Sequence, residues 1–439
     1  MGPTQELSVY RANTERVLGH GVRRRVRPIA VGIAAVVLVA VSFPAAVASG
    51  RTAPSSDSFY SYSGTRPLSR IPAGTVLNAR PIQLALGPGS TTPVRAEQLM
   101  YRTSDQRGLP SVTVTTVLLP ASGSIAPRIV GYLSFYDGLA STCDPSFTLA
   151  GGDTKNSTYQ QEAQEEELLA GWYLAQGDIV TIPDFEGTGL HWMAGRESGY
   201  GTLDAIRATE SFLRVSPATP VGLSGYSGGS VAADWASELA PAYAPKVNIV
   251  GVAEGGIPAN YVDHFAYMNG TVEYSAAIPG ELLGLSRAYG VDLTKYLTPY
   301  GRKVVQREST GCIASAFGTT PGLTVESIML PGFRDLAHVA PFAGMLRDQT
   351  MGTAVTHPRE PLLMSIGNAD GKGDGAMVAA DVNALARLYC RDGVPVDYQE
   401  FKGASHIEAA AYFEPEAGPF LQDRFAGLPF PNTCASLGR

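Results

Sequence analysis

The spacing of apolar residues after about residue 110 predicts short strands that alternate with helices. Runs rich in β-branched residues at 112–119, 128–134 and 179–182 are typical of buried strands, and 159–175 is expected to form a helix. The acidic run Glu165-Glu166-Glu167 is expected to be a solvated face of that helix. The alternation continues with a helix at 203–213, a strand at 221–224, an Ala-rich helix at 230–239 and a strand at 247–252. This succession favours a mostly parallel sheet with helices on both faces, in which ligands gather at the carboxyl ends of the strands.

The alternation stops between residues 257 and 353, where no clear strand is present. This segment contains many Gly and Pro residues and apolar helical stretches such as 281–289. We interpret it as a helical cap inserted into an α/β core that comprises 78–256 and 354–439. The core pattern resumes with a strand at 362–366, a helix at 378–390, a strand at 396–401 and a final helix at 419–425. The apolar residues of the cap could line an acyl tunnel or form the cap's own core: Leu282, Leu283, Leu285, Phe317, Met329, Leu330 and Phe342.

The first 48 residues have the features of an export signal. Four Arg residues within 23–27 precede an uninterrupted apolar run at 29–43, which is short for a membrane span. Ala46-Val47-Ala48 then has the small-x-small pattern that a signal peptidase reads. We expect a cleaved signal at 1–48 and a secreted protein, with an uncleaved segment that anchors the protein as the alternative. Residues 49–77, rich in Ser, Pro, Gly and Arg, are expected to form a leader that wraps on the surface without regular structure.

Composition and charge exclude several classes of protein. The chain has 439 residues, of which 44% are hydrophobic and only 17% charged, against about 25% charged in an average protein, so disorder is excluded. Residues 1–48 contain six of the 33 basic and two of the 40 acidic residues, which leaves the exported chain with a formal charge of −11. This charge disfavours nucleic acid as a partner.

All four Cys residues lie in the part of the chain that we expect to be exported. An oxidising compartment there favours two disulfides, and four cysteines allow three pairings.

The pentapeptide Gly225-Tyr226-Ser227-Gly228-Gly229 fits the Gly-x-Ser-x-Gly nucleophile elbow. It follows the strand predicted at 221–224 and precedes the helix predicted at 230–239, which is the setting that an elbow requires. Ser227 is therefore a candidate nucleophile. A plain Gly-rich turn between strand and helix is the competing interpretation.

A serine nucleophile needs a base and a group that orients the base, and in this fold they follow in the order Ser, acid, His. His406 comes after the strand at 396–401, where the base belongs, whereas the other histidines after Ser227 lie in or beside the cap. The loop after the strand at 362–366 offers two acids. Asp370 is nearer the strand end and is preferred, while the count back from the following helix favours Asp374. The loop fits calcium poorly because Lys372 stands where a ligand oxygen is needed, so we expect no metal.

Several blocks in order resemble the secretory lipase family of the Candida lipase A type. They include Gly225 to Gly229, Trp235-Ala236, Tyr243-Ala244-Pro245 and Glu254-Gly255-Gly256-Ile257-Pro258-Ala259-Asn260. Tyr136-Asp137-Gly138 with Cys143 and Pro145-Ser146 is similar to the family's oxyanion segment, and Pro183-Asp184-Phe185-Glu186-Gly187 with Leu203-Asp204 and Arg207-Ala208 is similar to its next block. The resemblance covers about residues 60 to 423. Departures are a longer acid loop and Gly138 where a Ser is common.

The resemblance implies an α/β-hydrolase fold with a helical cap, no cofactor, and hydrolysis of carboxylic esters including triacylglycerols, with a lipid surface as a possible partner. The oxyanion would meet the backbone N–H of Gly228. The family adds Asp137 as a second oxyanion group, which must donate through its backbone N–H or stay protonated. The resemblance also implies two disulfide pairs, Cys143 with Cys312 and Cys390 with Cys434.

Three other functions compete with a lipase. A short-chain esterase needs only a pocket where a lipase needs a long apolar groove. A serine peptidase on the same scaffold is disfavoured because no acidic cluster for an N-terminal amine is evident. A non-catalytic exported binding protein would have lost its triad, whereas Ser227 and His406 are present.

Overall fold

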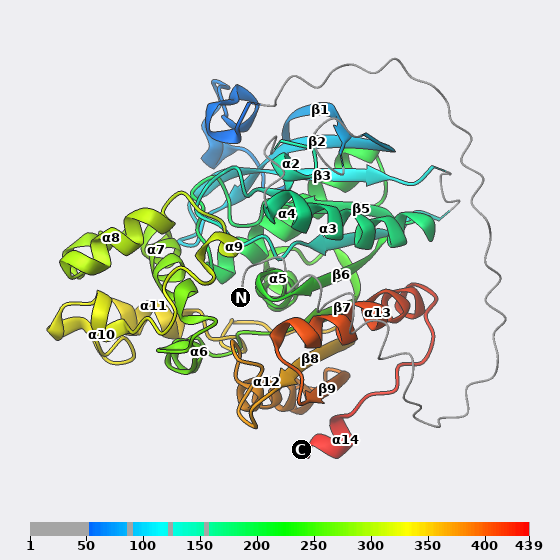
Figure 1. Ribbon diagram of the computed structural model, residues 1–439. Helices are drawn as coiled ribbons and strands as arrows, with labels where there is room; N and C mark the ends of the chain where they lie inside the picture. Colours follow the sequence, from blue (N-terminus) through cyan, green and yellow to red (C-terminus); the bar gives the residue numbers. More distant parts are fainter. Residues whose placement is uncertain (1–51, 86–90, 122–125, 153–157, 439) are drawn as a thin grey trace. The chain divides into compact units, whose positions relative to one another are not determined.

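The core of the protein is a single twisted sheet. The computed structural model describes residues 52–85, 91–121, 126–152 and 158–438; the predicted signal at 1–48 lies outside them. Within these residues nine strands pair in the order β1-β2-β3-β5-β4-β6-β7-β8-β9 (Figure 1). Their bounds are β1 Val76–Leu84, β2 Thr92–Ser104, β3 Pro110–Leu119, β4 Ile129–Leu133, β5 Ile179–Pro183, β6 Pro220–Tyr226, β7 Asn248–Gly255, β8 Leu362–Asn368 and β9 Val396–Lys402.

The sheet is parallel from β5 to β9 and antiparallel at the β1 edge. β4 pairs with β5 and β6 in parallel, whereas β3 runs antiparallel to β5 and β2 to β3. The carboxyl ends of β4 to β9 therefore meet at one edge of the sheet. The apolar pattern did not predict β1 and β2. β1 and the first residues of β2 alternate between partly buried and exposed positions, and the buried remainder of β2 includes the polar residues Gln98, Thr103 and Ser104, so neither strand has the continuous apolar run that marks the central strands.

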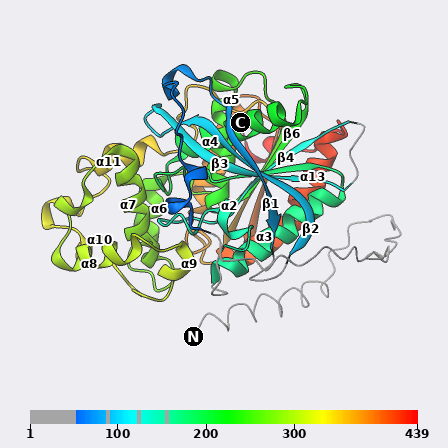
Figure 2. The same ribbon diagram turned by 90° about the horizontal axis from the view of Figure 1, so that it is seen from above.

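Helices cover both faces of the sheet. One face carries α4 Gly195–Leu213, α5 Gly228–Tyr243 and α12 Ala379–Arg391, and the other carries α3 Thr158–Ala175 and α13 His406–Phe425. Figure 2 shows α4 and α5 on one side of the sheet and α3 and α13 on the other. Along β4, Ile129 and Leu133 join the first core cluster, whereas Val130 and Tyr132 join the second. This period of two is the mark of a strand buried on both faces. The arrangement is the α/β-hydrolase fold that the sequence predicted.

The segment between β7 and β8 forms the helical cap. Its helices are α6 Tyr261–Met268, α7 Ile278–Tyr289, α8 Pro299–Glu308, α9 Ile313–Ala316, α10 Val325–Ile328 and α11 Phe342–Asp348. Leu282, Leu285, Met329 and Phe342 are fully buried and belong to one continuous apolar cluster. These four residues are therefore packed in the same apolar cluster as one face of the sheet. Phe317 is different, because 39% of its surface is exposed.

Two helices begin much earlier than the sequence predicted. α4 begins at Gly195, eight residues before the expected start, and α13 begins at His406, not at residue 419. Both segments contain residues that disfavour helices, Gly in α4 and Pro415 in α13, and tertiary packing overrides this preference. A reciprocal capping box between Ser405 and Glu408 sets the start of α13.

The prediction that the acidic run on α3 faces solvent is wrong for two of its three residues. Glu166 and Glu167 are 2% and 7% exposed. Glu166 accepts a hydrogen bond from the backbone N–H of Phe135 at 2.9 Å, just beyond the end of β4. The run lies against the end of the sheet, which a local charge pattern does not reveal.

The leader is more ordered than expected. Three short turns, η1 Pro54–Ser56, η2 Ser58–Tyr60 and η3 Leu68–Arg70, precede β1. Phe59 and Tyr60 are buried against Met100 and Val114 of the sheet. The leader thus covers part of the antiparallel edge.

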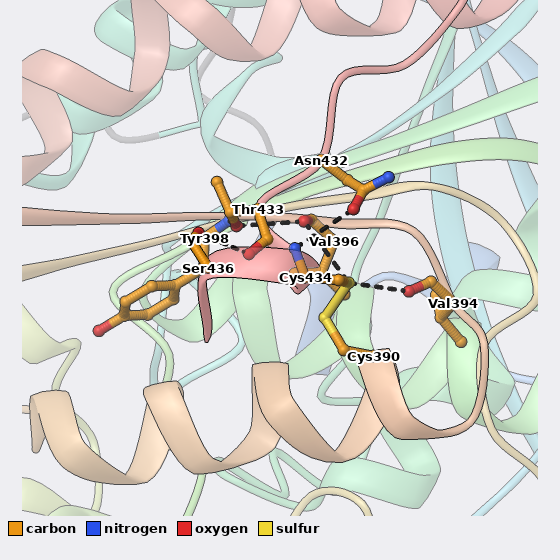
Figure 3. The surroundings of a disulfide bond; sticks show 8 residues. All are labelled: Cys390, Val394, Val396, Tyr398, Asn432, Thr433, Cys434 and Ser436. Atoms are coloured by element: carbon orange, nitrogen blue, oxygen red, sulfur yellow. Dashed lines mark hydrogen bonds between the residues drawn. A yellow bond between two sulfur atoms is a disulfide. The ribbon is translucent and has the colours of Figure 1, made fainter. Parts of the chain in front are cut away.

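Two disulfides join distant segments. Cys143 is bonded to Cys312 and Cys390 to Cys434, the pairing that the family resemblance implies. The second bond ties the tail after α13 to the end of α12 (Figure 3). There the Thr433 N–H donates to the Val396 carbonyl and the Tyr398 N–H donates to the Thr433 hydroxyl, both at 2.8 Å. The tail therefore forms hydrogen bonds with backbone groups of the edge strand β9.

In the described part of the chain, no helix combines the length and apolar character needed to cross a membrane.

Candidate active site

Ser227 lies in a strained turn between β6 and α5. Its backbone has φ 54° and ψ −120°, a conformation that non-glycine residues rarely adopt. The flanking glycines make this turn possible. A Cβ at Gly225 would lie 2.3 Å from the Gly229 carbonyl oxygen, and a Cβ at Gly229 would lie 2.0 Å from the Leu133 carbonyl oxygen. The turn raises the Ser227 hydroxyl at the carboxyl edge of the sheet, as the sequence predicted.

His406 and Asp374 complete a chain of hydrogen bonds with Ser227. Nε2 of His406 is 2.9 Å from Ser227 Oγ, and Nδ1 is 2.7 Å from Asp374 Oδ2. The other carboxylate oxygen of Asp374 accepts from the N–H groups of Ala376 and Met377. Asp374 is 1% exposed and His406 is 6% exposed. The carboxylate can therefore hold the imidazole in the tautomer whose Nε2 accepts a proton from Ser227.

The structure places Asp370, the preferred acid from the sequence, away from His406. Asp370 is exposed, and its Oδ1 accepts from the N–H groups of Lys372 and Gly373 within its own loop. These two bonds lower the pKa of Asp370. The Ala369 N–H donates to the Gly373 carbonyl at 2.7 Å, which folds the loop back so that Asp374 reaches the histidine. The distance from the strand end, which favoured Asp370, does not take this turn into account, whereas the count back from α12 agrees with the position of Asp374 beside His406.

Asp137 and Gly228 face each other above the Ser227 turn. Asp137 is 4% exposed and has a positive φ of 20°. A Cβ at Gly228 would lie 2.1 Å from Asp137 Oδ1, so the carboxyl group covers the start of α5. Burial, followed by the charge of Glu281, raises the pKa of Asp137 well above its usual value. The structure thus brings both predicted oxyanion residues to one place.

The Cys143–Cys312 bond connects the segment of Asp137 to the cap. The Ile313 N–H donates to the Asp137 carbonyl at 3.0 Å, and the Leu139 N–H donates to the Gly311 carbonyl at 2.9 Å. A Cβ at Gly138 would lie 2.6 Å from the Cβ of Cys143. In this geometry a side chain at position 138 would require the disulfide or the backbone to shift.

Aromatic side chains of the cap approach the histidine. The ring of Tyr274 packs edge-on to His406 with centroids 6.0 Å apart, and Phe317 packs edge-on to Tyr274 at 5.9 Å. Sequence reasoning singled out Phe317 but missed Tyr274, because no sequence motif marks Tyr274 as a residue near the site.

In the described ranges, no group of three or more His, Cys, Asp or Glu residues is arranged to hold a metal ion.

Buried carboxyl groups near the site predict a loss of stability as the pH rises from about 4 to about 7. Burial raises the pKa of Asp184 to about 7 and that of Glu166 to about 7. In the folded protein each group keeps its proton at pH values where the unfolded chain has lost it. The stabilisation is complete below the unfolded pKa of about 4 and is lost as the pH rises through about 7. We expect the free energy of unfolding to fall by about 1.4 kcal/mol per pH unit for each such group between these values.

Urea unfolding at pH 5, 6.5 and 8, at constant ionic strength, measures this dependence. Glu166→Gln removes one titrating group and should flatten the curve between pH 5 and pH 7. A free energy of unfolding that rises from pH 5 to pH 8 would contradict the prediction.

Comparison with known proteins identifies the family. Residues 154–432, more than half of the chain, match the family model of secretory lipases. The chain belongs to the secretory lipase family. The resemblance seen in the sequence blocks is therefore confirmed, and this secretory lipase family member has the hydrolase fold of its relatives.

The relatives of this secretory lipase family member match most of its length. A Mycobacterium tuberculosis protein named "Probable inactive lipase" is 32% identical over 367 residues, which cover 81% of this chain and 79% of that protein. Lipase A of Arthroderma benhamiae is 31% identical and covers 87% of this chain and 81% of its own. The crystal structure of Candida antarctica lipase A in its closed state has a TM-score of 0.78 and 26% identity, with 88% and 89% of the two chains covered.

Proposed function

We propose that the protein is a secreted serine hydrolase of carboxylic esters, with triacylglycerols and other lipid esters as its substrate class. The observation that carries this proposal is the position of His406 between Ser227 and Asp374, with hydrogen bonds of 2.9 and 2.7 Å. The names of the relatives, which include lipase A and secreted triacylglycerol lipases, support the substrate class. Family membership and the two disulfides support export, which would proceed through the signal predicted at 1–48.

In the proposed mechanism Ser227 Oγ attacks the ester carbonyl carbon while its proton passes to His406 Nε2. Asp374 accepts the Nδ1–H bond and stabilises the imidazolium. The oxyanion is held by the Gly228 N–H and by Asp137. His406 then returns the proton to the leaving alcohol, which leaves an acyl-Ser227 intermediate, and a water activated by the same histidine releases the acid.

The experiment that tests the function is hydrolysis of p-nitrophenyl esters from acetate to palmitate and of an emulsified triacylglycerol. A lipase should retain kcat/KM on the long acyl chains and hydrolyse the emulsion, whereas a short-chain esterase should favour acetate and butyrate. One relative is named a probable inactive lipase, so the absence of ester hydrolysis is the alternative outcome that this experiment tests. A folded, disulfide-bonded sample that hydrolyses none of these esters would refute the proposal and favour a binding role.

A further inference from the structure

His264 is a buried histidine of the cap to which the mechanism above gives no role. It lies on α6, is 2% exposed, and is flanked by the rings of Tyr261 and Phe265, whose centroids are 6.1 and 5.7 Å away. Its Nδ1 is 3.0 Å from the Ala376 carbonyl oxygen, and its Nε2 is 3.1 Å from Glu281 Oε2 on α7. The imidazole therefore connects two helices of the cap to the loop that carries the triad acid.

The partners of His264 determine where its ring protons lie. A carbonyl oxygen can only accept a hydrogen bond, so Nδ1 must carry a proton to bond to Ala376. The Glu281 carboxyl group holds the opposite side of the ring, which fixes the ring orientation. Burial opposes a charge on the ring, but the charge of Glu281, the hydrogen bonds to Glu281 and Ala376, and the charge of Asp374 outweigh it and raise the pKa of His264. A ring that donates from both nitrogens satisfies both partners at once.

One peptide unit joins His264 to the triad acid. The Ala376 carbonyl and the Met377 N–H belong to the same planar peptide, so the direction of one fixes the direction of the other. The Met377 N–H donates to Asp374 Oδ1 at 2.7 Å. A hydrogen bond at the carbonyl end also polarises the peptide and strengthens the bond that its N–H makes. The imidazole thus acts on the carboxylate through this peptide.

These contacts continue to the nucleophile as one line of hydrogen bonds. Asp374 Oδ2 is 2.7 Å from His406 Nδ1, and His406 Nε2 is 2.9 Å from Ser227 Oγ. Asp374, Ala376 and Met377 are all buried, so solvent does not compete for these bonds. A change in the cap at His264 is therefore transmitted to the orientation of the triad acid.

Other contacts hold the loop without fixing the 376–377 peptide. The Asp374 N–H donates to the Met377 carbonyl at 3.1 Å, and the Ala379 N–H donates to the Lys372 carbonyl at 2.9 Å. Among the described residues, no backbone N–H donates to the Ala376 carbonyl. A variant without the imidazole should therefore keep the turn of the loop but lose the fixed orientation of this one peptide.

We propose that His264 is a positioning residue of the triad, which holds the 376–377 peptide from the cap so that its N–H keeps the Asp374 carboxylate directed at His406. The inference rests on the proposed esterase function. A misaligned carboxylate stabilises the imidazolium less well during proton transfer, which lowers kcat without weakening the binding of the ester. The Ala376 N–H still donates to Asp374 at 2.9 Å when His264 is replaced, so the loss should be partial.

His264→Asn and His264→Gln form a matched pair of uncharged variants. The side-chain nitrogen of Asn takes the position of Nδ1 and can donate to Ala376, whereas that of Gln takes the position of Nε2 and can donate to Glu281. Each variant thus keeps one of the two hydrogen bonds of the imidazole. We expect His264→Asn to retain kcat within about threefold and His264→Gln to lower it by about 10- to 100-fold, with KM changed by less than about threefold in both.

The low-field proton resonance of His406 Nδ1–H, which lies between His406 and Asp374, gives a second readout that needs no turnover. It is assigned by its absence from His406→Gln. We expect it to keep its position in His264→Asn and to shift or broaden in His264→Gln. A residue that only stabilises the fold would leave this resonance unchanged in the folded protein. Equal kcat values for the two variants, or an unchanged resonance in His264→Gln, would overturn the proposal.

A measurement on the wild type tests the proposal even if the variants do not fold. In protein with isotope-labelled histidine nitrogen and alanine carbonyl carbon, a scalar coupling across the hydrogen bond between His264 Nδ1 and the Ala376 carbonyl is expected at neutral pH. Its absence would overturn the proposal. If the wild type hydrolyses no ester while the His406 resonance responds as expected, the proposed function fails and the positioning by His264 stands.

Discussion

Ser227→Ala is expected to abolish ester hydrolysis, with kcat reduced by about 10⁶-fold. The reason is that His406 and Asp374 have no other hydroxyl to activate at 2.9 Å, and the remaining oxyanion donors act only weakly without a nucleophile. The measurement is kcat on the best p-nitrophenyl ester, together with labelling by a phosphonate ester. We expect one phosphonate per wild-type molecule, bound to the peptide that contains Ser227, and none on the variant.

Ser230→Ala is the matched control for this variant. Its hydroxyl lies one helical turn away and donates to the Ser227 carbonyl at 2.6 Å, not to His406. We expect this control to retain kcat within about tenfold and to be labelled like the wild type. Wild-type turnover in Ser227→Ala, or phosphonate on another residue, would refute the assignment of the nucleophile.

Asp374→Asn and Asp370→Asn are expected to separate by about three orders of magnitude in kcat. Asp374 is buried and accepts from His406 at 2.7 Å, so an amide in its place no longer stabilises the imidazolium and favours the wrong tautomer. We expect a loss of about 10³- to 10⁴-fold at neutral pH. Asp370 is exposed and bonds to backbone N–H groups of its own loop, which Asn can also do. Its substitution should change kcat by less than about threefold.

Both variants keep the size of the side chain, so thermal unfolding should show that both are folded. The comparison is decisive because the two acids are in one loop, four residues apart. A larger loss for Asp370→Asn than for Asp374→Asn would mean that the loop rearranges when substrate binds and that the hydrogen bond to His406 seen here is not the one used in catalysis.

The local sequence determined much of this fold and site. The central strands are predicted well because burial on both faces requires continuous apolar runs, as in 129–133 and 179–183. The elbow at Ser227 is predictable because a strained turn between strand and helix needs glycine at fixed positions. His406 could be predicted as the base because in this fold the three residues follow along the chain in the order Ser, acid, His. The strands and the elbow depend on interactions between residues that are close in sequence, or on a pattern that one strand carries alone.

The tertiary structure decided the features that depend on long-range contacts. The choice of Asp374 over Asp370 depends on how the acid loop folds back toward a histidine 32 residues further along. The burial of Glu166 depends on the end of β4, and Gly138 lies against a disulfide that joins segments 169 residues apart. The sequence contains each of these residues, but their chemistry arises only when folding removes water from between them.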